Sequence, residues 1–264
     1  MNIFKENLFS GKTSFIVGGT SGINLGIAQA LGRLGSNVFV VSRSQEKVAS
    51  AVEELSSMGI NAAGAIADVR NYDAVYSAAA SCAEKFGEIN HIVSGAAGNF
   101  VSPAEQLTSN GFKTVVDIDL VGTFNVCRAG FDFLSYGASI INISAVQAFT
   151  PMQGQAHVCA AKAGIEALTK VLAIEWGSKG IRVNAIAPGA VGDTEGMRRL
   201  TPTAEHEQKY KKTIPLGRYA RIEEIAATAI FLCSSAGENF TGEVVVCDGG
   251  QSLIGGGSFK DAWT

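Results

Sequence analysis

The sequence has few of the features that tie a chain to a metal, a membrane or nucleic acid. Its five cysteines are scattered and include no CxxC pair, which argues against a disulfide framework or a zinc site. The formal net charge of -3 gives no electrostatic reason to expect nucleic acid or an anionic membrane as a partner. No apolar run is long enough to span a bilayer. We therefore expect no metal, no membrane anchor and no nucleic acid.

Targeting signals are missing as well. Residues 1–10 are polar and mixed, unlike a signal peptide, and residues 261–264 match no retention or peroxisomal signal. Scattered cysteines also suit a reducing compartment. These observations predict a cytoplasmic protein.

Prolines are few, five against 31 glycines, while 47% of the residues are apolar and 17% are charged. This composition is typical of a globular protein with a large buried core and argues against disorder. The glycines indicate tight turns and close backbone approaches. Because the chain shows no linker-like composition shift, low-complexity segment or repeat, we expect a single domain over residues 1–264.

Short β-branched runs alternate with longer helical patterns along the chain. The strand residues are nearly all apolar, as expected when helices cover both faces of a parallel sheet. The alternation predicts a doubly wound parallel α/β sheet of the Rossmann type with seven strands. The strands are predicted at residues 13–17, 38–41, 62–66, 91–93, 139–143, 182–186 and 244–247. The helices are predicted at residues 22–34, 45–58, 72–86, 104–133, 155–176 and 222–232.

One stretch, residues 189–215, interrupts the alternation after the sixth strand. It is polar and carries charges of both signs. Ligands bind at the carboxyl edge of such sheets, so this position predicts a substrate lid. A tolerated surface insertion is the alternative.

The first predicted strand runs into a glycine-rich sequence, Gly18-Gly19-Thr20-Ser21-Gly22-Ile23, and a helix follows. Glycines let the backbone approach a pyrophosphate, and free N–H groups at the helix N-terminus favour its negative charge. The order of strand, loop and helix near the start of the chain indicates a dinucleotide site. We assign Gly18, Thr20, Ser21, Gly22 and Ile23 to cofactor binding.

The end of the second strand indicates which dinucleotide binds. NAD sites usually place an acid there to hold the ribose 2′-hydroxyl, whereas this chain has Ser42-Arg43-Ser44. No carboxylate repels a 2′-phosphate, and the Arg43 guanidinium can hold one through two parallel hydrogen bonds. We therefore predict NADPH, bound by Ser42 and Arg43. A solvated Arg43 at the start of a helix is the alternative.

These motifs, and others over nearly the whole chain, resemble the short-chain dehydrogenase/reductase family. The match includes Asp68-Val69, Ala97-Gly98, Asn142-Ile143-Ser144, Lys162, Pro188-Gly189 and Asp248-Gly249-Gly250. The resemblance implies that Asp68 and Val69 hold the adenine ring and that Lys162 binds the nicotinamide ribose. It also implies that residues 188–194 line the nicotinamide. The remaining cofactor contacts implied are Ala96, Ala97, Gly98, Pro188, Gly189, Val191 and Thr194.

The chain departs from the family pattern at the catalytic positions. The family's Tyr is replaced by Val158, its Ser by Ala145 and its Asn by Asp119, so that Lys162 alone is kept. The third glycine of the loop is replaced as well, by Asn24. Reducing a ketone requires a proton at an alkoxide oxygen, which a Tyr acidified by Lys supplies and a Val cannot. We therefore do not expect interconversion of alcohols and ketones.

A different reduction needs no such Tyr. Hydride can add to the distal end of a conjugated dienoyl thioester, giving a dienolate whose oxygen needs hydrogen bonds rather than a proton. The proton then goes to carbon, from a carboxylic acid or an acid-activated water near a Lys. Enoyl-carrier-protein reductases fit less well, because the Tyr that they place seven residues before the Lys falls on Gln155.

Several strings resemble 2,4-dienoyl-CoA reductases, most closely the peroxisomal type, in which an Asp and a Lys take over the proton chemistry. They are residues 96–100, 112–119, 122–126 and 194–200, and His157-Val158, where a small residue stands in place of the Tyr. The resemblance implies an NADPH-dependent reductase of 2,4-dienoyl-CoA thioesters, with an acyl-CoA as its substrate.

We hypothesise that Asp119 is the catalytic acid, acting through a water, and that Lys162 tunes it. Asp is a poor helix former, so its place in the middle of a predicted helix needs a reason. A solvated or capping acid is the alternative. Asp117 ranks second, because it lies two residues away and points to another helix face.

The resemblance also implies the contacts to the substrate. Phe100 would form a wall of the acyl pocket. Ser109 and Asn110 would meet the thioester arm. Arg70 and Arg199 would meet the phosphates of CoA, for which a guanidinium is well suited, although each could equally be an ordinary surface charge.

Two other functions stay open. The chain could reduce another activated alkene or a carbonyl, or it could be an inactive NADP-binding protein. His157 has no evident catalytic partner, and we expect a structural histidine with satisfied hydrogen bonds. Members of the family usually form tetramers, and the apolar surface of residues 129–134 and 160–173 fits a homotetramer or, equally, the internal core.

Overall fold

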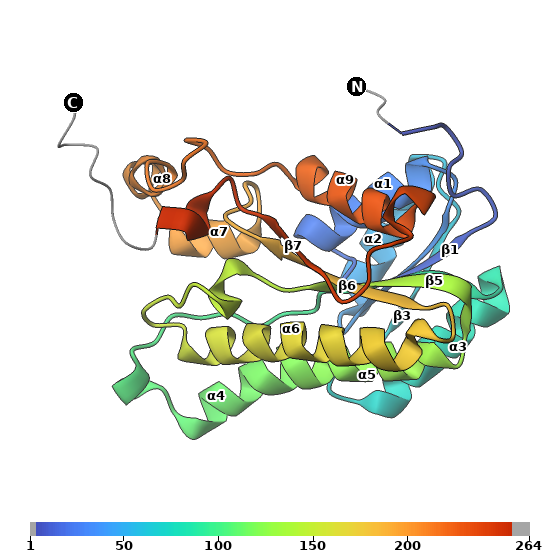
Figure 1. Cartoon of the computed structure of the whole chain (residues 1–264), viewed down its shortest axis with the longest axis horizontal. Coiled ribbons are helices and arrows are strands. Elements are labelled where there is room, and N and C mark those ends of the chain that lie inside the picture. Colours follow the sequence, from blue (N-terminus) through green and yellow to red (C-terminus); the bar gives the residue numbers. More distant parts are fainter. Residues whose placement is uncertain (1–3, 255–264) are drawn as a thin grey trace.

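A seven-stranded parallel sheet lies at the centre of the protein, with helices on both faces (Figure 1). The structure is a computed structural model that describes residues 4–254, so the tail at 261–264 lies outside it. The strand order is β3-β2-β1-β4-β5-β6-β7. The strands are β1 (Thr13–Val17), β2 (Asn37–Ser42), β3 (Ala62–Ile66), β4 (Ile89–Ser94), β5 (Leu134–Ile143), β6 (Arg182–Pro188) and β7 (Val244–Cys247). The predicted doubly wound sheet is confirmed.

The helices follow the strands and several begin at side-chain caps. Ser44 Oγ accepts a hydrogen bond from Lys47 N, and Asn71 Oδ1 accepts one from Ala74 N, which fixes where two of them start. Within residues 4–254, no helix is both long and apolar enough to cross a membrane. The α-helices are α1 (Gly22–Arg33), α2 (Gln45–Ser57), α3 (Tyr72–Phe86), α4 (Ser109–Val116), α5 (Gly122–Phe131), α6 (Ala156–Gly177), α7 (Glu195–Leu200), α8 (Ala204–Lys211) and α9 (Ile222–Cys233).

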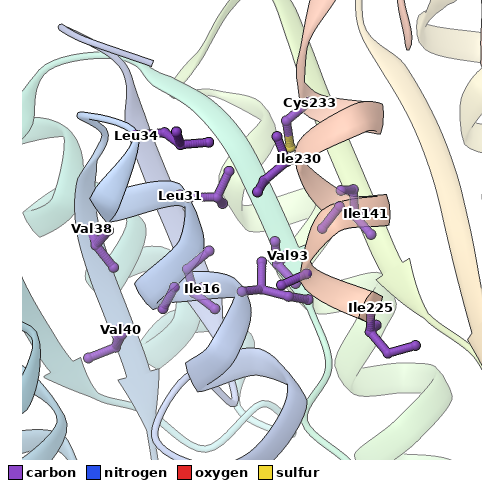
Figure 2. Packing of buried hydrophobic residues seen from close by; sticks show 14 of the residues in the cluster. Ile16, Leu31, Leu34, Val38, Val40, Val93, Ile141, Ile225, Ile230 and Cys233 are labelled. Atoms are coloured by element: carbon purple, nitrogen blue, oxygen red, sulfur yellow. The ribbon is translucent and has the colours of Figure 1, made fainter. Parts of the chain in front are cut away.

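Alternate side chains of each strand enter two separate cores. Ile16 of β1 lies in the core that α1, α2 and α9 cover, together with Leu31 and Ile225 (Figure 2). Phe15, its neighbour in the chain, lies in the other core, under α3, α5 and α6. This division follows from the two-residue period of a strand. It explains why the strand sequences are apolar at nearly every position.

The single helix predicted over residues 104–133 is wrong. The segment begins with a 3-10 turn at Ala104–Gln106, and Thr108 then caps the N-terminus of α4. A π-helical turn, Asp117–Val121, separates α4 from α5. A π turn inserts an extra residue into the helical ladder and is often found at functional sites. Strand β5 also starts earlier than predicted, at Leu134.

The segment predicted as a lid carries two short helices, α7 and α8. Its polar face is exposed, while Met197 and Ile214 pack with Ala190, which follows the end of β6. This small apolar cluster attaches the segment to the carboxyl edge of the sheet.

Candidate active site

The predicted cofactor residues come together in one cleft of about 770 Å³ at the carboxyl ends of the strands. Such an edge is where doubly wound sheets bind ligands. Loops after β1 to β6 and the start of α7 line the cleft. Its lining includes all of the predicted cofactor residues: Gly18, Thr20, Ser21, Gly22, Ile23, Ser42, Arg43, Asp68, Val69, Ala96, Ala97, Gly98, Lys162, Pro188, Gly189, Val191 and Thr194.

The glycine-rich loop leaves room for a ligand at the start of α1. Gly18 and Gly22 have φ angles of +76° and +55°, which side chains rarely allow. A Cβ on Gly18 would lie 2.8 Å from Ala96 N. Ser21, at the N-cap, makes no side-chain hydrogen bond to the helix, which leaves the first N–H groups for a ligand. The loop therefore fits a pyrophosphate.

Asn24 occupies the position of the loop's third glycine without blocking the cleft. Its side chain is buried and donates weakly to Val17 O, at 3.4 Å. It fills the space above Gly95, where an added Cβ would lie 2.3 Å from Asn24 Nδ2. Asn24 is therefore accommodated because Gly95 has no side chain.

Two cations line the cleft beyond the end of β2. Arg43 was predicted from the sequence, whereas Lys47 was not. Lys47 lies in the first turn of α2, which begins soon after the carboxyl end of β2, and this position is the signal that could have found it. Together they can neutralise a phosphate better than either alone.

Arg70 lies outside the cleft lining and binds Asp68. Its Nη2 lies 2.6 Å from Asp68 Oδ2, and its Nε donates to both carboxylate oxygens. These hydrogen bonds lower the pKa of Asp68 to about 2, so that its side chain is a carboxylate at neutral pH. Asp68 itself remains at the cleft, where a carboxylate can accept hydrogen bonds from a ligand.

Asp119 and Lys162 form a buried ion pair at the floor of the cleft, which Lys162 lines and Asp119 does not. Lys162 Nζ lies 3.2 Å from Asp119 Oδ2 and donates to Ile143 O at 3.1 Å. Asp119 Oδ1 accepts a hydrogen bond of 2.7 Å from Gly98 N. The side chains are only 1% and 7% exposed, so solvent does not screen the pair. Asp119 Oδ2 receives no aligned hydrogen bond from the described residues and faces the ammonium of Lys162.

The π turn explains how Asp119 reaches this position. Asp119 faces the protein interior, whereas Asp117 is partly exposed and pairs with Lys113 on the outer face of the helix. The sequence argument that the two acids point to different faces is thus confirmed. The structure places Asp119, and not Asp117, beside Lys162.

Comparison with known proteins identifies the family. The family model for Enoyl-(Acyl carrier protein) reductase matches residues 17–252. The chain is similar to a peroxisomal, (3E)-enoyl-CoA-producing 2,4-dienoyl-CoA reductase of Arabidopsis thaliana, at 40% identity over 95% of this chain and 87% of the relative. It is also similar to the structure of a short chain dehydrogenase from Bacillus anthracis, at 37% identity and a TM-score of 0.82, over 91% of this chain and 96% of the other. The chain belongs to the short-chain dehydrogenase/reductase family.

As a member of this family the protein is an oxidoreductase, and the family uses nicotinamide cofactors. One similar structure, a gluconate 5-dehydrogenase from Burkholderia cenocepacia, is a complex with NADP and tartrate. It is 28% identical, has a TM-score of 0.89, and covers 94% of this chain and 98% of its own. Across residues 4–254, no three His, Cys, Asp or Glu side chains gather as a metal site requires.

The positions of the family's catalytic Tyr and Ser carry no hydroxyl in this chain. Val158, at the Tyr position, is buried, and Ala145, at the Ser position, lines the cleft. No hydroxyl therefore stands at either position beside Lys162 to protonate an alkoxide.

Two amide side chains, Asn99 and Gln147, line the cleft near Lys162 and were not predicted as site residues. Asn99 lies in a string already noted for its resemblance to dienoyl-CoA reductases, and Gln147 follows Ala145 at the end of β5. Position at the carboxyl end of a strand is the signal that could have indicated both.

The residues implied as substrate contacts fall into two groups. Phe100 and Arg199 line the cleft. Ser109 and Asn110 lie in the first turn of α4, outside the lining, and Arg70 is engaged with Asp68 as described above.

His157 is not the satisfied structural residue that the sequence suggested. It is fully buried, and neither ring nitrogen has a hydrogen-bond partner among the described residues. Its ring packs against Phe100, with the ring centroids 4.3 Å apart. The residue therefore supports the wall of the cleft through packing alone.

Proposed function

We propose that the protein is an NADPH-dependent reductase of 2,4-dienoyl-CoA thioesters. The observation that carries this proposal is the buried pair Asp119–Lys162 beside a site without a hydroxyl at the Tyr position. A ketone reductase needs a proton donor to oxygen, which this arrangement lacks. A dienoyl reductase needs a proton donor to carbon, which an acid in an enclosed site can provide. The relatives named as 2,4-dienoyl-CoA reductases support this choice.

NADPH is the proposed cofactor because Arg43 and Lys47 line the end of the cleft where the adenine ribose would lie. A guanidinium and an ammonium together favour a 2′-phosphate, and neither Arg43 nor Ser44, directly after β2, is a carboxylate that would repel it. Asp68 and Val69 would hold the adenine, and Lys162 the nicotinamide ribose hydroxyls. Residues 188–194 and Ala96 to Gly98 would surround the nicotinamide end.

The reaction has two steps on the substrate. NADPH held in the cleft would supply a hydride, and this hydride would add to the distal carbon of the conjugated diene. The electron pair moves toward the thioester oxygen and gives a dienolate. A proton then adds to the α-carbon, leaving one double bond and a 3-enoyl thioester, in keeping with the product that the name of the Arabidopsis thaliana relative states.

Asp119 would act in that proton transfer through a water and through Lys162, whose ammonium carries the proton of the ion pair. The Asp119 side chain is fully buried and does not line the cleft, so it cannot touch the α-carbon directly. Lys162, which lines the cleft, can pass its proton to a water there, and Asp119 Oδ2, 3.2 Å from Nζ, stabilises the ammonium. Solvent outside the site restores the proton after each turnover.

The acyl-CoA would enter beside the segment 189–215, which we propose as the lid of a single-domain enzyme. Phe100 would form the wall of the acyl pocket. Arg199 lies on α7 at the cleft and is positioned for the CoA phosphates. Ser109, Asn110 and Arg70 would contact the CoA arm only once the substrate extends beyond the cleft.

A homotetramer in the cytoplasm completes the proposal. Apolar side chains on α5 and α6 are exposed in the single chain, among them Phe124 and Ile174, the latter 82% exposed. A second copy that covers them would remove this surface from water. The name of the Arabidopsis thaliana relative states a peroxisomal protein, so the location in the cytoplasm stays a prediction.

The experiment that tests the function is the oxidation of NADPH on addition of 2,4-hexadienoyl-CoA, followed by its absorbance. The proposal predicts rapid turnover with the dienoyl thioester. Turnover only with another activated alkene or a carbonyl would assign a different reductase. Tight NADPH binding without turnover of any substrate would indicate an inactive nucleotide-binding protein.

A further inference from the structure

The loop after β3, residues 67–71, offers one acceptor and one donor to the cleft, which Asp68 and Val69 line. The Asp68 carboxylate can accept hydrogen bonds because Arg70 keeps it ionised. The backbone N–H of Val69 makes no hydrogen bond within the described residues. An acceptor beside a free N–H complements the edge of an adenine, where the 6-amino donor lies next to the acceptor N1.

Two residues of α5 hold this loop in place. Asn125, 7% exposed, donates through Nδ2 to the backbone oxygen of Val69 at 2.8 Å. Gly122, one turn earlier, packs against the Val69 side chain, since a Cβ on Gly122 would lie 2.7 Å from Val69 Cγ2. Neither residue lines the cleft. Val69 is therefore held by its carbonyl and its side chain, and its N–H stays available to a ligand.

Asn125 makes the central attachment of the loop to the rest of the protein. The other hydrogen bonds of residues 67–71 lie within the loop or join its ends to β2 and α3. Among the described residues, Asn125 is the only side chain from outside the loop that hydrogen-bonds to it. Without this donor a buried carbonyl loses its partner, and the loop can relax away from the position that the structure shows.

We propose that Asn125 is a positioning residue for the adenine of NADPH and thereby sets the preference for adenine over a base that lacks the 6-amino group. It holds the Val69 N–H at the place where N1 would accept it, beside the Asp68 carboxylate. Gly122 leaves the room that Val69 needs. This inference rests on the dinucleotide cofactor of the proposed function and does not depend on the acyl substrate.

The first test measures coenzyme binding by the full-length Asn125→Leu variant. Leu has a similar size and no donor. The two probes are NADPH and its deamino analogue, in which hypoxanthine replaces adenine, and fluorescence of the bound coenzyme gives both Kd values. We expect the Kd of NADPH to rise roughly tenfold, as loss of a buried hydrogen-bond partner implies. The Kd of the analogue should change less than threefold, because its base carries a hydrogen on N1 and an oxygen on C6 and already lacks both contacts.

Two comparisons separate positioning from general support of the fold. Asn184→Leu is the matched control, because this buried amide also donates at 2.8 Å to a backbone carbonyl, that of Phe240, and does not line the cleft. It should leave the ratio of the two Kd values unchanged. NADH should lose affinity in Asn125→Leu in parallel with NADPH, since both carry adenine, whereas kcat at saturating NADPH should stay within threefold.

Gly122→Ala reaches the same loop by a second route. Its methyl group would displace Val69, so we expect the same selective loss of NADPH over the deamino analogue. Ala favours a helix over Gly, so α5 itself is not weakened by this change. Hydrogen exchange of the backbone amides at 67–71, measured without any coenzyme, should be faster in both variants.

The outcomes distinguish this inference from the proposed function. Failure of the unchanged protein to bind NADPH or NADH would refute the proposed cofactor. If the unchanged protein binds NADPH, equal weakening of NADPH and the deamino analogue in Asn125→Leu and Gly122→Ala would assign Asn125 to support of the fold and would overturn this inference alone. A Kd of NADPH within threefold of the unchanged protein in both variants would overturn it as well.

Discussion

Lys162 Nζ lies 3.2 Å from Asp119 Oδ2, and the two side chains are almost completely buried. Removing one member of such a pair leaves the other as an uncompensated buried charge. The only other hydrogen bonds that these side-chain ends make within the described residues go to backbone atoms, Ile143 O and Gly98 N. The pair is therefore held by the fold and is available to chemistry at the cleft.

Asp119→Asn should remove the carboxylate that holds the Lys162 ammonium while keeping the shape of the side chain. We expect kcat with a 2,4-dienoyl-CoA to fall roughly 10²-fold or more, the scale of a general acid, and Lys162→Ala should have a loss of similar size. Steady-state kinetics with NADPH measure both. Asp117→Asn is the matched control on the same helical turn and should stay near wild-type activity. The assignment fails if Asp119→Asn turns over normally while Asp117→Asn does not.

Arg43→Ala should weaken the binding of NADPH and leave that of NADH nearly unchanged. Loss of a charge-assisted contact to the 2′-phosphate is expected to raise KM for NADPH roughly tenfold to a hundredfold. Lys47→Ala should act in the same direction with a smaller effect. Arg33→Ala, an exposed arginine at the end of α1, serves as the control. An unchanged ratio of NADPH to NADH efficiency in Arg43→Ala would refute the cofactor assignment.

Gly95→Ala should destabilise the protein because its Cβ would lie 2.3 Å from Asn24 Nδ2. Overpacking of this kind costs about 1–3 kcal/mol of unfolding free energy. Adding Asn24→Ala removes the obstructing atoms and should restore most of the loss, as denaturant titration would show. Gly177→Ala has open space around its Cβ and is the control. Additive effects of the two substitutions would show that Asn24 and Gly95 do not compete for the same space.

His91 should make the stability of the fold depend on pH. Burial, together with the nearby charges of Lys12 and Arg182, lowers the pKa of His91 to about 3, whereas an unfolded histidine has a pKa of about 6.5. Above the pKa of the unfolded histidine, the neutral His91 ring contributes fully to the stability of the folded protein. This contribution to stability is lost as the pH falls from that value toward 3. The loss can reach about 1.4 kcal/mol per pH unit.

His91→Asn provides the comparison, because it keeps a polar group near Ser14 Oγ, the partner of His91 Nδ1, and cannot titrate. Denaturant unfolding at several pH values between about 6 and 4 should show a shallower decline for the variant. Parallel curves for the two proteins would show that His91 does not contribute this pH dependence.

The sequence was sufficient to predict the sheet because its signals are local and strongly periodic. Each of the seven strands includes its predicted run, although β4 and β5 start earlier, and the glycine loop lies between β1 and α1. The break near Asp119 could not be predicted, because a π turn depends on how the helix packs against Gly98 and Lys162 rather than on its own residues.

Among the site residues, too, some could be predicted from local sequence and others depend on contacts between distant parts of the chain. Arg43 follows from its place at the end of a strand, and Asp119 beside Lys162 follows from a chemical argument about the missing Tyr. The hydrogen bonds of Gln155 with Asn99 and Gln147 join three distant stretches of the chain, so they exist only once the fold is formed. The prediction that His157 has satisfied hydrogen bonds was wrong, because the sequence does not show whether a buried imidazole has a hydrogen-bond partner.

The most direct test of the function follows where the proton goes. The enzyme would be run in deuterium oxide with NADPH and 2,4-hexadienoyl-CoA, with simple ketones assayed in parallel. We predict a 3-enoyl thioester that carries solvent deuterium at its α-carbon, and no turnover of the ketones. Brisk reduction of the ketones, with the conjugated thioester left unreacted, would contradict a site built to protonate carbon.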